Sequence, residues 1–283
     1  MAHEDKREFE IFMDVQRGLP RQGPGNAAST LKALSLCREL LPPHSVEILD
    51  VGCGPGAQTV DLAAELPDAK IAAVDLLQEF LDQLKTRAEK AGVLGRIEIL
   101  QGDMNELQSV WGSPVELRSW NRTVYYALEP FADSGKTFDL IWSEGAAYIM
   151  GFEKALRSWK ALLKPHGCIA VSEATWLQQA EDKIPAEVKE FWANEYPNMK
   201  NVGENVEIFK SAGYKLLGHF TLPNEVWWED YYDPLEKKLP ALVEKYSGDP
   251  EGLKIVENSR KEIEMRRKYP EVYGYVFFVG QKA

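Results

Sequence analysis

Hydrophobic residues follow two alternating spacings between residues 46 and 172. Short apolar runs, typical of buried parallel strands, alternate with stretches whose apolar residues recur every three or four positions, typical of amphipathic helices. The expected strands are 46–51, 70–74, 96–100, 138–142 and 168–172. The expected helices are 29–41, 58–66, 78–91 and 152–163. Strands that alternate with helices predict an α/β fold with a parallel, doubly wound sheet.

The last third of the chain has a different pattern. Its expected helices are 185–195, 204–212, 235–246 and 251–268, and its expected strands are 214–222 and 273–279. Four aromatic residues precede the helix 235–246, namely Trp227, Trp228, Tyr231 and Tyr232. No segment rich in Gly, Pro or Ser divides the chain. We therefore expect a single domain over 1–283, with helical cap elements and an N-terminal helical or lid segment at 1–45.

Length, composition and charge exclude several classes of protein. With 283 residues, 45% of them hydrophobic, the chain can bury a sizeable core. No stretch approaches the ~20 apolar residues that cross a bilayer, and the polar first ten residues lack the apolar core of a secretory signal, so we expect a cytoplasmic protein and no membrane partner. The net charge of −11 argues against a nucleic-acid partner, because such proteins neutralise phosphates with cationic surface. The three cysteines and four histidines form no ligand pattern, so we expect no metal site.

A glycine-rich turn follows the first strand. Residues 52–56 read Gly-Cys-Gly-Pro-Gly and lead into the helix 58–66. Glycines at such a turn let the backbone approach a ligand closely. Asp75 lies roughly 20 residues further on, at the end of the second strand, where a carboxylate can accept both hydroxyls of a ribose. The pattern predicts a nucleotide-like cofactor at the carboxyl ends of the strands.

This pattern fits two kinds of cofactor. Gly52, Gly54 and Ala57 also match the GxGxxG/A spacing of NAD(P)-dependent oxidoreductases, which remain an alternative on that spacing alone. Asp50 favours S-adenosylmethionine, because an acid before the first glycine repels a pyrophosphate and attracts an ammonium and a sulfonium group. Asp103, after the third strand, favours the same cofactor because its carboxylate can accept the adenine amino group.

Residues 47–56 resemble motif I of class I S-adenosylmethionine-dependent methyltransferases, and Asp75 and Asp103 match the acidic positions after their second and third strands. Other segments resemble a group of small bacterial and archaeal methyltransferase-domain proteins: Arg21-Gln22-Gly23-Pro24-Gly25, Trp142-Ser143-Glu144-Gly145-Ala146, Val171-Ser172-Glu173 and Tyr273-Gly274-Tyr275. The resemblance covers nearly the whole chain. It implies a Rossmann-like sheet of seven strands, mostly parallel, with an antiparallel last strand at 273–279. The residues expected to bind the cofactor are Asp50, Gly52, Cys53, Gly54, Gly56, Asp75, Leu76, Asp103, Met104 and, from the lid, Arg21.

Candidate acceptor residues follow the fourth and fifth strands, because ligands bind at the carboxyl ends of parallel strands. Glu144 and Tyr148 are the candidate catalytic residues, although Glu144 also fits an acid at a helix N-terminus. Glu173 is a further candidate of the same kind. Aromatic faces attract cations, so aromatic side chains are expected to line a substrate pocket or, alternatively, to pack in the core. These residues are Trp176, Trp227, Trp228, Tyr231 and Tyr232.

In-line methyl transfer requires alignment and a dry site more than one particular catalytic group. We therefore expect a methyltransferase that acts on a small-molecule acceptor, with the acceptor atom and the use of a general base left open. The alternatives are an NAD(P)-dependent oxidoreductase and a cofactor-binding or interaction module without catalysis.

Residues 108–129 interrupt the connection after the third strand, where loops typically have ~2–6 residues. The Leu-Pro-Phe stretch of the family is split here between Leu107 and Pro130-Phe131. We expect 108–129 to be an insertion. Its large aromatic residues fit a lid or a contact surface, and a neutral insertion is the alternative, because long surface loops cost little closure entropy.

Overall fold

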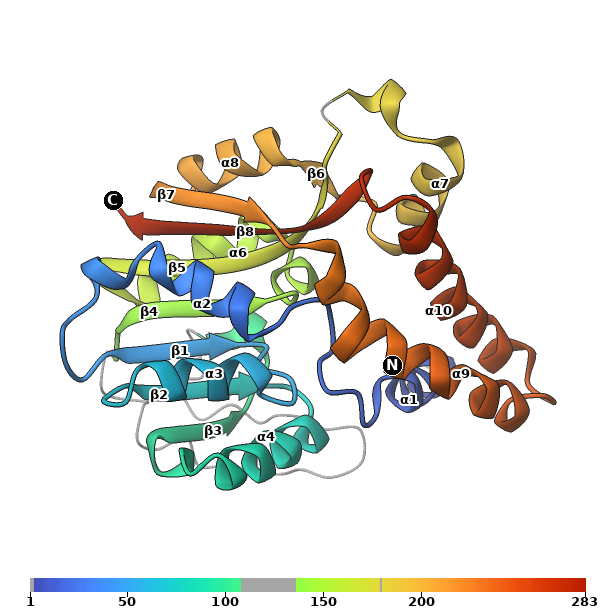
Figure 1. The fold of residues 1–283 in the computed structure, drawn as a ribbon, viewed down its shortest axis with the longest axis horizontal. Helices are drawn as coiled ribbons and strands as arrows, with labels where there is room; N and C mark the ends of the chain where they lie inside the picture. Colours follow the sequence, from blue (N-terminus) through green and yellow to red (C-terminus); the bar gives the residue numbers. More distant parts are fainter. Residues whose placement is uncertain (1–2, 108–135, 179) are drawn as a thin grey trace.

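One mixed sheet organises the chain, and its strands follow the order β3-β2-β1-β4-β5-β8-β7 (Figure 1). The computed structural model describes residues 3–107, 136–178 and 180–283. The strands are β1 (Glu47–Val51), β2 (Lys70–Asp75), β3 (Ile97–Gln101), β4 (Phe138–Glu144), β5 (Leu163–Trp176), β6 (Lys200–Asn201), β7 (Tyr214–Thr221) and β8 (Tyr273–Lys282). β1 to β5 pair in parallel, and β8 runs antiparallel to both β5 and β7. The predicted doubly wound sheet with an antiparallel last strand is confirmed, and the two-residue β6, paired with β5, adds an eighth strand to the seven expected.

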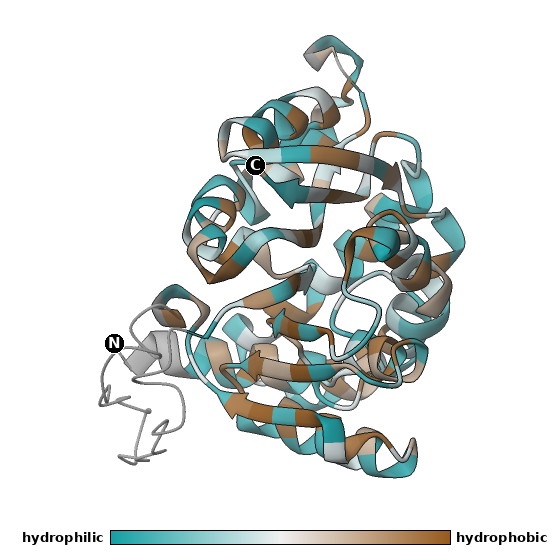
Figure 2. Ribbon diagram, turned by 90° about the vertical axis from the view of Figure 1, so that its left-hand side faces the viewer, coloured by the Kyte–Doolittle hydropathy of each residue, from teal (hydrophilic) through white to brown (hydrophobic). Residues whose placement is uncertain are grey.

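Both faces of the central strands are buried. Neighbouring residues of β1 point to opposite sides, so Ile48 belongs to one hydrophobic cluster and Leu49 to another. The first cluster contains side chains of α2 (Ala27–Ser35), α3 (Ala57–Glu65) and α4 (Gln78–Lys90), and the second contains side chains of α6 (Phe152–Trp159) and α8 (Val202–Ser211). Helices on both faces explain why these strands are apolar at consecutive positions, as the hydropathy colouring shows (Figure 2).

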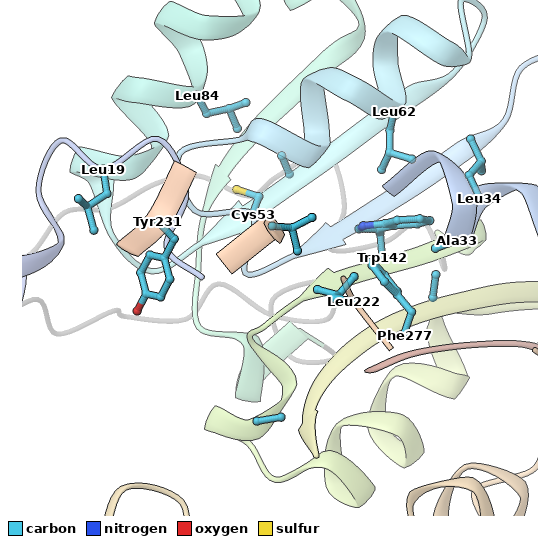
Figure 3. Close-up of a cluster of buried hydrophobic side chains, with 14 of the residues drawn as sticks. Leu19, Ala33, Leu34, Cys53, Leu62, Leu84, Trp142, Leu222, Tyr231 and Phe277 are labelled. Atoms are coloured by element: carbon cyan, nitrogen blue, oxygen red, sulfur yellow. The ribbon is translucent and has the colours of Figure 1, made fainter. Parts of the chain in front are cut away.

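Trp142 lies at the centre of the first cluster. Its ring is fully buried, and its centroid lies 5.7 Å from that of Phe277 on β8, with Leu34 and Leu62 in the same cluster (Figure 3). A buried aromatic side chain of this size joins β4 to two helices and to the antiparallel strand.

Two expected elements differ from the structure. The helix expected at 29–41 divides into α2 and the 3-10 turn η1 (Arg38–Leu40). β5 is much longer than the expected 168–172, because its first residue pairs with β4 and its last residues pair with β8, which an apolar run alone does not reveal. The other 3-10 turns are η2 (Leu94–Arg96), η3 (Met104–Glu106), η4 (Ala147–Ile149), η5 (Lys160–Leu162), η6 (Glu181–Lys183) and η7 (Asn224–Trp227).

A helical cap lies beyond the carboxyl ends of the parallel strands (Figure 1). It consists of α1 (His3–Gln16), α7 (Ala186–Glu195), the π-helical turn η8 (Trp228–Tyr232), α9 (Asp233–Lys245) and α10 (Pro250–Lys268). α1 packs against α9 and α10 and buries Ile11 and Val15, which lie one helical turn apart. A helical or lid segment was expected at 1–45, but not this helix in particular, because its few apolar residues become an interface only when the cap is assembled.

Among the residues described, no helix is long and apolar enough to cross a membrane. The predicted insertion 108–129 lies outside the described residues, so it stays a prediction.

Gly56 provides a test of the packing between α3 and α4. It precedes α3 with φ 76°, and a Cβ there would lie 2.1 Å from Cδ1 of Leu84. We expect Gly56→Ala to lower the free energy of unfolding by about 2–4 kcal/mol, through backbone strain and overpacking. Leu84→Ala alone should cost about 2–5 kcal/mol. The double variant should lose less than the sum, because the shortened side chain removes the contacts at 2.1 and 2.8 Å and leaves only the one with Cβ of residue 84 at 2.9 Å.

Urea unfolding of the wild type, the two single variants and the double variant measures these free energies of unfolding. Gly92→Ala is the matched control, because Gly92 has φ 71° with no atom within 4 Å of the added Cβ. It should show the backbone cost alone, about 1–2 kcal/mol. Equal losses in Gly56→Ala and Gly92→Ala would contradict the packing role of Gly56.

Candidate functional site

A pocket of about 330 Å³ lies where the carboxyl ends of β1 and β4 diverge. This is the position at which the strand order reverses, and open α/β sheets bind ligands there. The predicted cofactor residues that line the pocket are Arg21, Gly52, Cys53, Gly54, Asp75, Leu76, Asp103 and Met104. The predicted catalytic residues Glu144 and Tyr148 also line it. The structure therefore brings residues from the N-terminal segment and four strand ends to one site.

The three glycines of the turn after β1 have different surroundings. A Cβ on Gly52 would lie 2.5 Å from Cβ of Ala146, so close packing excludes a side chain there. Gly54 has φ 53° and faces open space, with Cγ of Gln22 3.6 Å from its would-be Cβ. Gly56 does not contribute to the described lining of the pocket and instead packs against α4. Gly54 is thus the glycine that leaves room for a ligand.

Asp75 is oriented by backbone groups. The N–H of Gly54 donates to its Oδ2 at 2.8 Å, and the N–H of Leu77 donates to its Oδ1 at 3.0 Å. Burial raises the pKa of this carboxyl group, while the hydrogen bonds from the backbone oppose the shift. The carboxylate is fixed at the edge of the pocket with lone pairs left to accept further hydrogen bonds.

Asp103 begins η3 and accepts hydrogen bonds at Oδ1 from the backbone N–H and the side-chain amide of Asn105, at 2.8 and 2.9 Å. Both bonds end on one oxygen, so the other oxygen of Asp103 can accept from a ligand.

Asp50 lies behind the glycine turn and does not form part of the described lining of the pocket. Its side chain is fully buried, and Oδ2 accepts a hydrogen bond from the Thr59 hydroxyl at 2.6 Å, whereas Oδ1 has no partner among the described residues. Burial raises the pKa of Asp50 to about 7, with Thr59 opposing the shift and the charge of Glu144 adding to it. In the structure Asp50 joins β1 to α3.

Glu144 and Arg21 form a buried ion pair. The Arg21 guanidinium donates to Glu144 at 3.1 Å and to Asp61 on α3 at 3.1 Å. The other oxygen of Glu144 accepts hydrogen bonds from the Thr30 hydroxyl at 2.8 Å and the Trp142 indole N–H at 2.9 Å. This network ties the N-terminal segment to the end of β4 and occupies both oxygens of the candidate catalytic acid.

Three predicted substrate residues lie away from the described lining of the pocket. Trp227 is buried, with the Arg266 guanidinium 4.1 Å from its ring centroid. Tyr231 belongs to the buried cluster drawn in Figure 3, and its ring stacks on that of Tyr232. Trp176 is partly buried and packs against Tyr273. In this structure these aromatic residues pack in the core, which was the alternative interpretation.

Side chains of α1 contribute to the pocket, and they were not among the residues predicted to do so. Phe9, Phe12 and Gln16 line the pocket, and Phe12 is 44% exposed. Their spacing of three and four residues matches one face of a helix and was a usable signal, but the charged residues between them obscured it. The described residues contain no group of His, Cys, Asp and Glu that could hold a metal ion.

The fold and the pocket define a class I S-adenosylmethionine-dependent methyltransferase. A family model described as a methyltransferase domain matches residues 44–238, and the chain belongs to that family.

Solved structures with this fold include methyltransferases bound to S-adenosylhomocysteine. The Geobacter sulfurreducens protein is 19% identical, with a TM-score of 0.72 over 97% of this chain and 98% of the other. The protein from Thiobacillus denitrificans is 20% identical, with a TM-score of 0.72 over 96% and 98% of the two chains. The fold is therefore shared over nearly the full length of both.

Sequence relatives share only part of their length with this chain. The release factor glutamine methyltransferase of Bacillus subtilis is 33% identical over 138 residues, which are 48% of this chain and 38% of that enzyme. The ubiquinone biosynthesis O-methyltransferase of Rickettsia felis is 31% identical over 117 residues, 38% and 46% of the two chains. The chain thus spans less than half the length of these relatives. By their names, the first methylates a glutamine of a release factor and the second is an O-methyltransferase.

The ion pair between Arg21 and Glu144 allows a stability prediction. Their side chains are 7% and 6% exposed, so Glu144→Gln removes a buried charge and leaves Arg21 with Asp61 as its acidic partner. We expect the free energy of unfolding to fall by about 3 kcal/mol, the scale for breaking a buried pair. Urea unfolding measures this loss. Glu153→Gln, in an exposed pair with Arg157, is the control and should change stability by less than about 1 kcal/mol.

The raised pKa of Asp50 predicts how stability depends on pH. The folded carboxyl group has a pKa of about 7, against an ordinary value of 3.8. Between these values the folded protein holds a proton that the unfolded chain releases, so stability falls as the pH rises through this window. Glu173, with a pKa of about 8, and Glu262, with a pKa of about 7, act in the same direction.

Thermal unfolding of the cofactor-free protein should therefore give a Tm that decreases between about pH 5 and pH 8. Asp50→Asn should reduce the slope, with each kcal/mol corresponding to ~2–4 °C in a domain of this size. A Tm that rises over this range would contradict the assignment of these buried acids.

Proposed function

We propose that the protein transfers the methyl group of S-adenosylmethionine to a small-molecule acceptor. The observation that carries this proposal is the pocket at the ends of β1 and β4, in which Gly54 leaves space for a ligand and Asp75 and Asp103 offer free acceptor lone pairs. When bound, the cofactor supplies an activated methyl group on a sulfonium.

The charges around the pocket favour this cofactor over NAD(P). The described lining residues include three carboxylates, Asp75, Asp103 and Glu144, and one cation, Arg21, which Glu144 and Asp61 already neutralise. An acidic lining repels a pyrophosphate and attracts a cofactor that carries a sulfonium and an ammonium group. The oxidoreductase alternative therefore requires a phosphate site that these residues do not provide.

In this proposal Asp75 accepts the two ribose hydroxyls and Asp103 accepts the adenine amino group. Gly52 and Gly54 give the cofactor close access to the backbone, and Leu76, which is 53% exposed, and Met104 contact the adenine. Arg21 holds the N-terminal segment in place through its ion pairs with Glu144 and Asp61.

A small acceptor fits the cover over the pocket. Phe9 and Phe12 of α1 and residues 22–24 line the site, so the N-terminal segment covers part of the pocket. Such a cover limits the space for the acceptor and holds the reacting groups in line, which is most of what methyl transfer requires of a protein. In this proposal Glu144 holds residues 21–24 over the pocket through its ion pair with Arg21, and Tyr148 contacts the acceptor.

Cofactor binding tests the role of Asp75. We expect Asp75→Ala to weaken binding of S-adenosylhomocysteine by ~1.5–3 kcal/mol, roughly 10–150-fold, because hydrogen bonds to a charged group are lost. Isothermal titration calorimetry measures the affinity, and thermal unfolding confirms that the variant is folded. Asp82→Ala is the control, since Asp82 is an exposed aspartate on α4 that does not contribute to the pocket lining.

Two results would overturn the proposed function. One is binding of NAD(H) or NADP(H) with no binding of S-adenosylmethionine in equilibrium dialysis. The other is cofactor binding with no transfer of a labelled methyl group to any component of a small-molecule extract, which would favour a module without catalysis.

A further inference from the structure

Glu173 is a buried carboxyl group that no described cation neutralises. Its side chain is 1% exposed, and neither oxygen has a hydrogen bond among the described residues. Burial raises its pKa to about 8, and the Tyr196 hydroxyl, which faces it, opposes the shift. Within the described part of the chain, no lysine, arginine or histidine forms an ion pair with it. Such a group costs several kcal/mol of stability unless something neutralises or solvates it.

Glu173 lies on β5, one residue beyond the position that pairs with Glu144, and it is not part of the described lining of the pocket. It follows Ser172, which is level with Glu144 on β4 and accepts a hydrogen bond from the Gly145 N–H at 3.0 Å. The next turn, η4, packs against β5 and carries Tyr148, which lines the pocket. Burial raises the pKa of Tyr148, and the charges of Glu262 and Glu173 add to the shift.

Aromatic rings and a second acid surround the same place. The rings of Tyr148 and Tyr196 meet edge to face, with centroids 5.7 Å apart. The second acid is Glu262 of α10, whose carboxyl group accepts a hydrogen bond from the Tyr232 hydroxyl at 2.8 Å. Carboxylates flanked by aromatic rings are a favourable environment for an organic cation.

We infer that the methyl acceptor is a small amine and that Glu173 binds its ammonium group. The Glu173 carboxylate takes a proton from the ammonium group, the freed nitrogen lone pair bonds to the methyl carbon, and the carbon–sulfur bond breaks with its electron pair left on the sulfur of S-adenosylhomocysteine. This inference rests on the proposed methyl transfer. An ammonium group supplies the hydrogen bonds that both Glu173 oxygens lack and the positive charge that no described residue provides. Tyr148 and Tyr196 contact the cation through their rings. The acceptor then lies between Glu173 and the cofactor pocket, on the far side of Tyr148.

The experiment uses the full chain, methyl-labelled S-adenosylmethionine and a small-molecule cell extract separated at neutral pH by ion exchange. Three pools are tested: cationic, neutral and anionic compounds. We expect label in the cationic pool alone. Glu173→Gln, which keeps the size of the side chain but not its charge, should reduce the rate by about 30-fold or more, as expected when one partner of a buried charge pair is removed. Its affinity for S-adenosylhomocysteine should not change.

Two further variants act as controls. Glu190→Gln replaces an exposed glutamate on α7 and should keep the wild-type rate. Glu173→Asp keeps the charge and should retain more activity than Glu173→Gln. If Glu173→Gln does not fold, the distribution of label made by the wild-type protein among the three pools still tests the inference.

Label in the neutral or anionic pool overturns the inference, as do equal rates for Glu173→Gln and the wild type. The absence of label from all pools, in a protein that binds S-adenosylhomocysteine, overturns the proposed function and the inference with it. Failure to bind S-adenosylhomocysteine would also overturn the proposed function.

Discussion

The buried contact between Arg21 and Glu144 is the interaction on which the arrangement of the site depends. Glu144 ends β4 at the switch in strand order, and Arg21 belongs to the segment between α1 and α2. By joining them, the pair fixes the N-terminal segment over the pocket, and the backbone contacts of Arg21 with Asp230 and of Gly25 with Val226 extend the connection to the cap. A buried pair contributes little net stability compared with apolar packing, but it specifies one geometry. Here that geometry is a covered pocket.

A second feature of this part of the molecule is a set of acids that form no ion pair with a described cation. Asp50, Glu173 and Glu262 all have a raised pKa because burial disfavours their charged forms. Groups of this kind reduce the stability of the empty protein, and they gather where ligands bind. Asp50 lies on β1, Glu173 on β5 and Glu262 on the cap helix α10. In the proposals above, the positive charges of the cofactor and of the amine acceptor compensate acids in this region.

The family of the chain and its acceptor depend on different parts of the molecule. The matched family region ends at residue 238, before most of the cap helices α9 and α10. The partial relatives share their sequence similarity over less than half of their length and act, by their names, on chemically unlike acceptors. We propose that the common sheet carries the cofactor site, while cap residues beyond the matched region, such as Glu262 on α10, distinguish the acceptor. Function in this fold is set by such added elements rather than by the sheet.

The sequence by itself determined the sheet and the cofactor end of the pocket. Apolar runs, the glycine turn at 52–56 and Asp75 are local signals, because backbone conformation and strand periodicity depend on neighbouring residues. Tertiary structure decided the rest. Only the packed fold shows that Gly56 faces Leu84 rather than the pocket, that Glu144 is occupied by Arg21, and that α1 covers the site. Burial has the largest effect. Glu173 and Glu144 both follow an apolar strand in the sequence, and only the packing of strands and helices gives Glu144 a cation and leaves Glu173 without one.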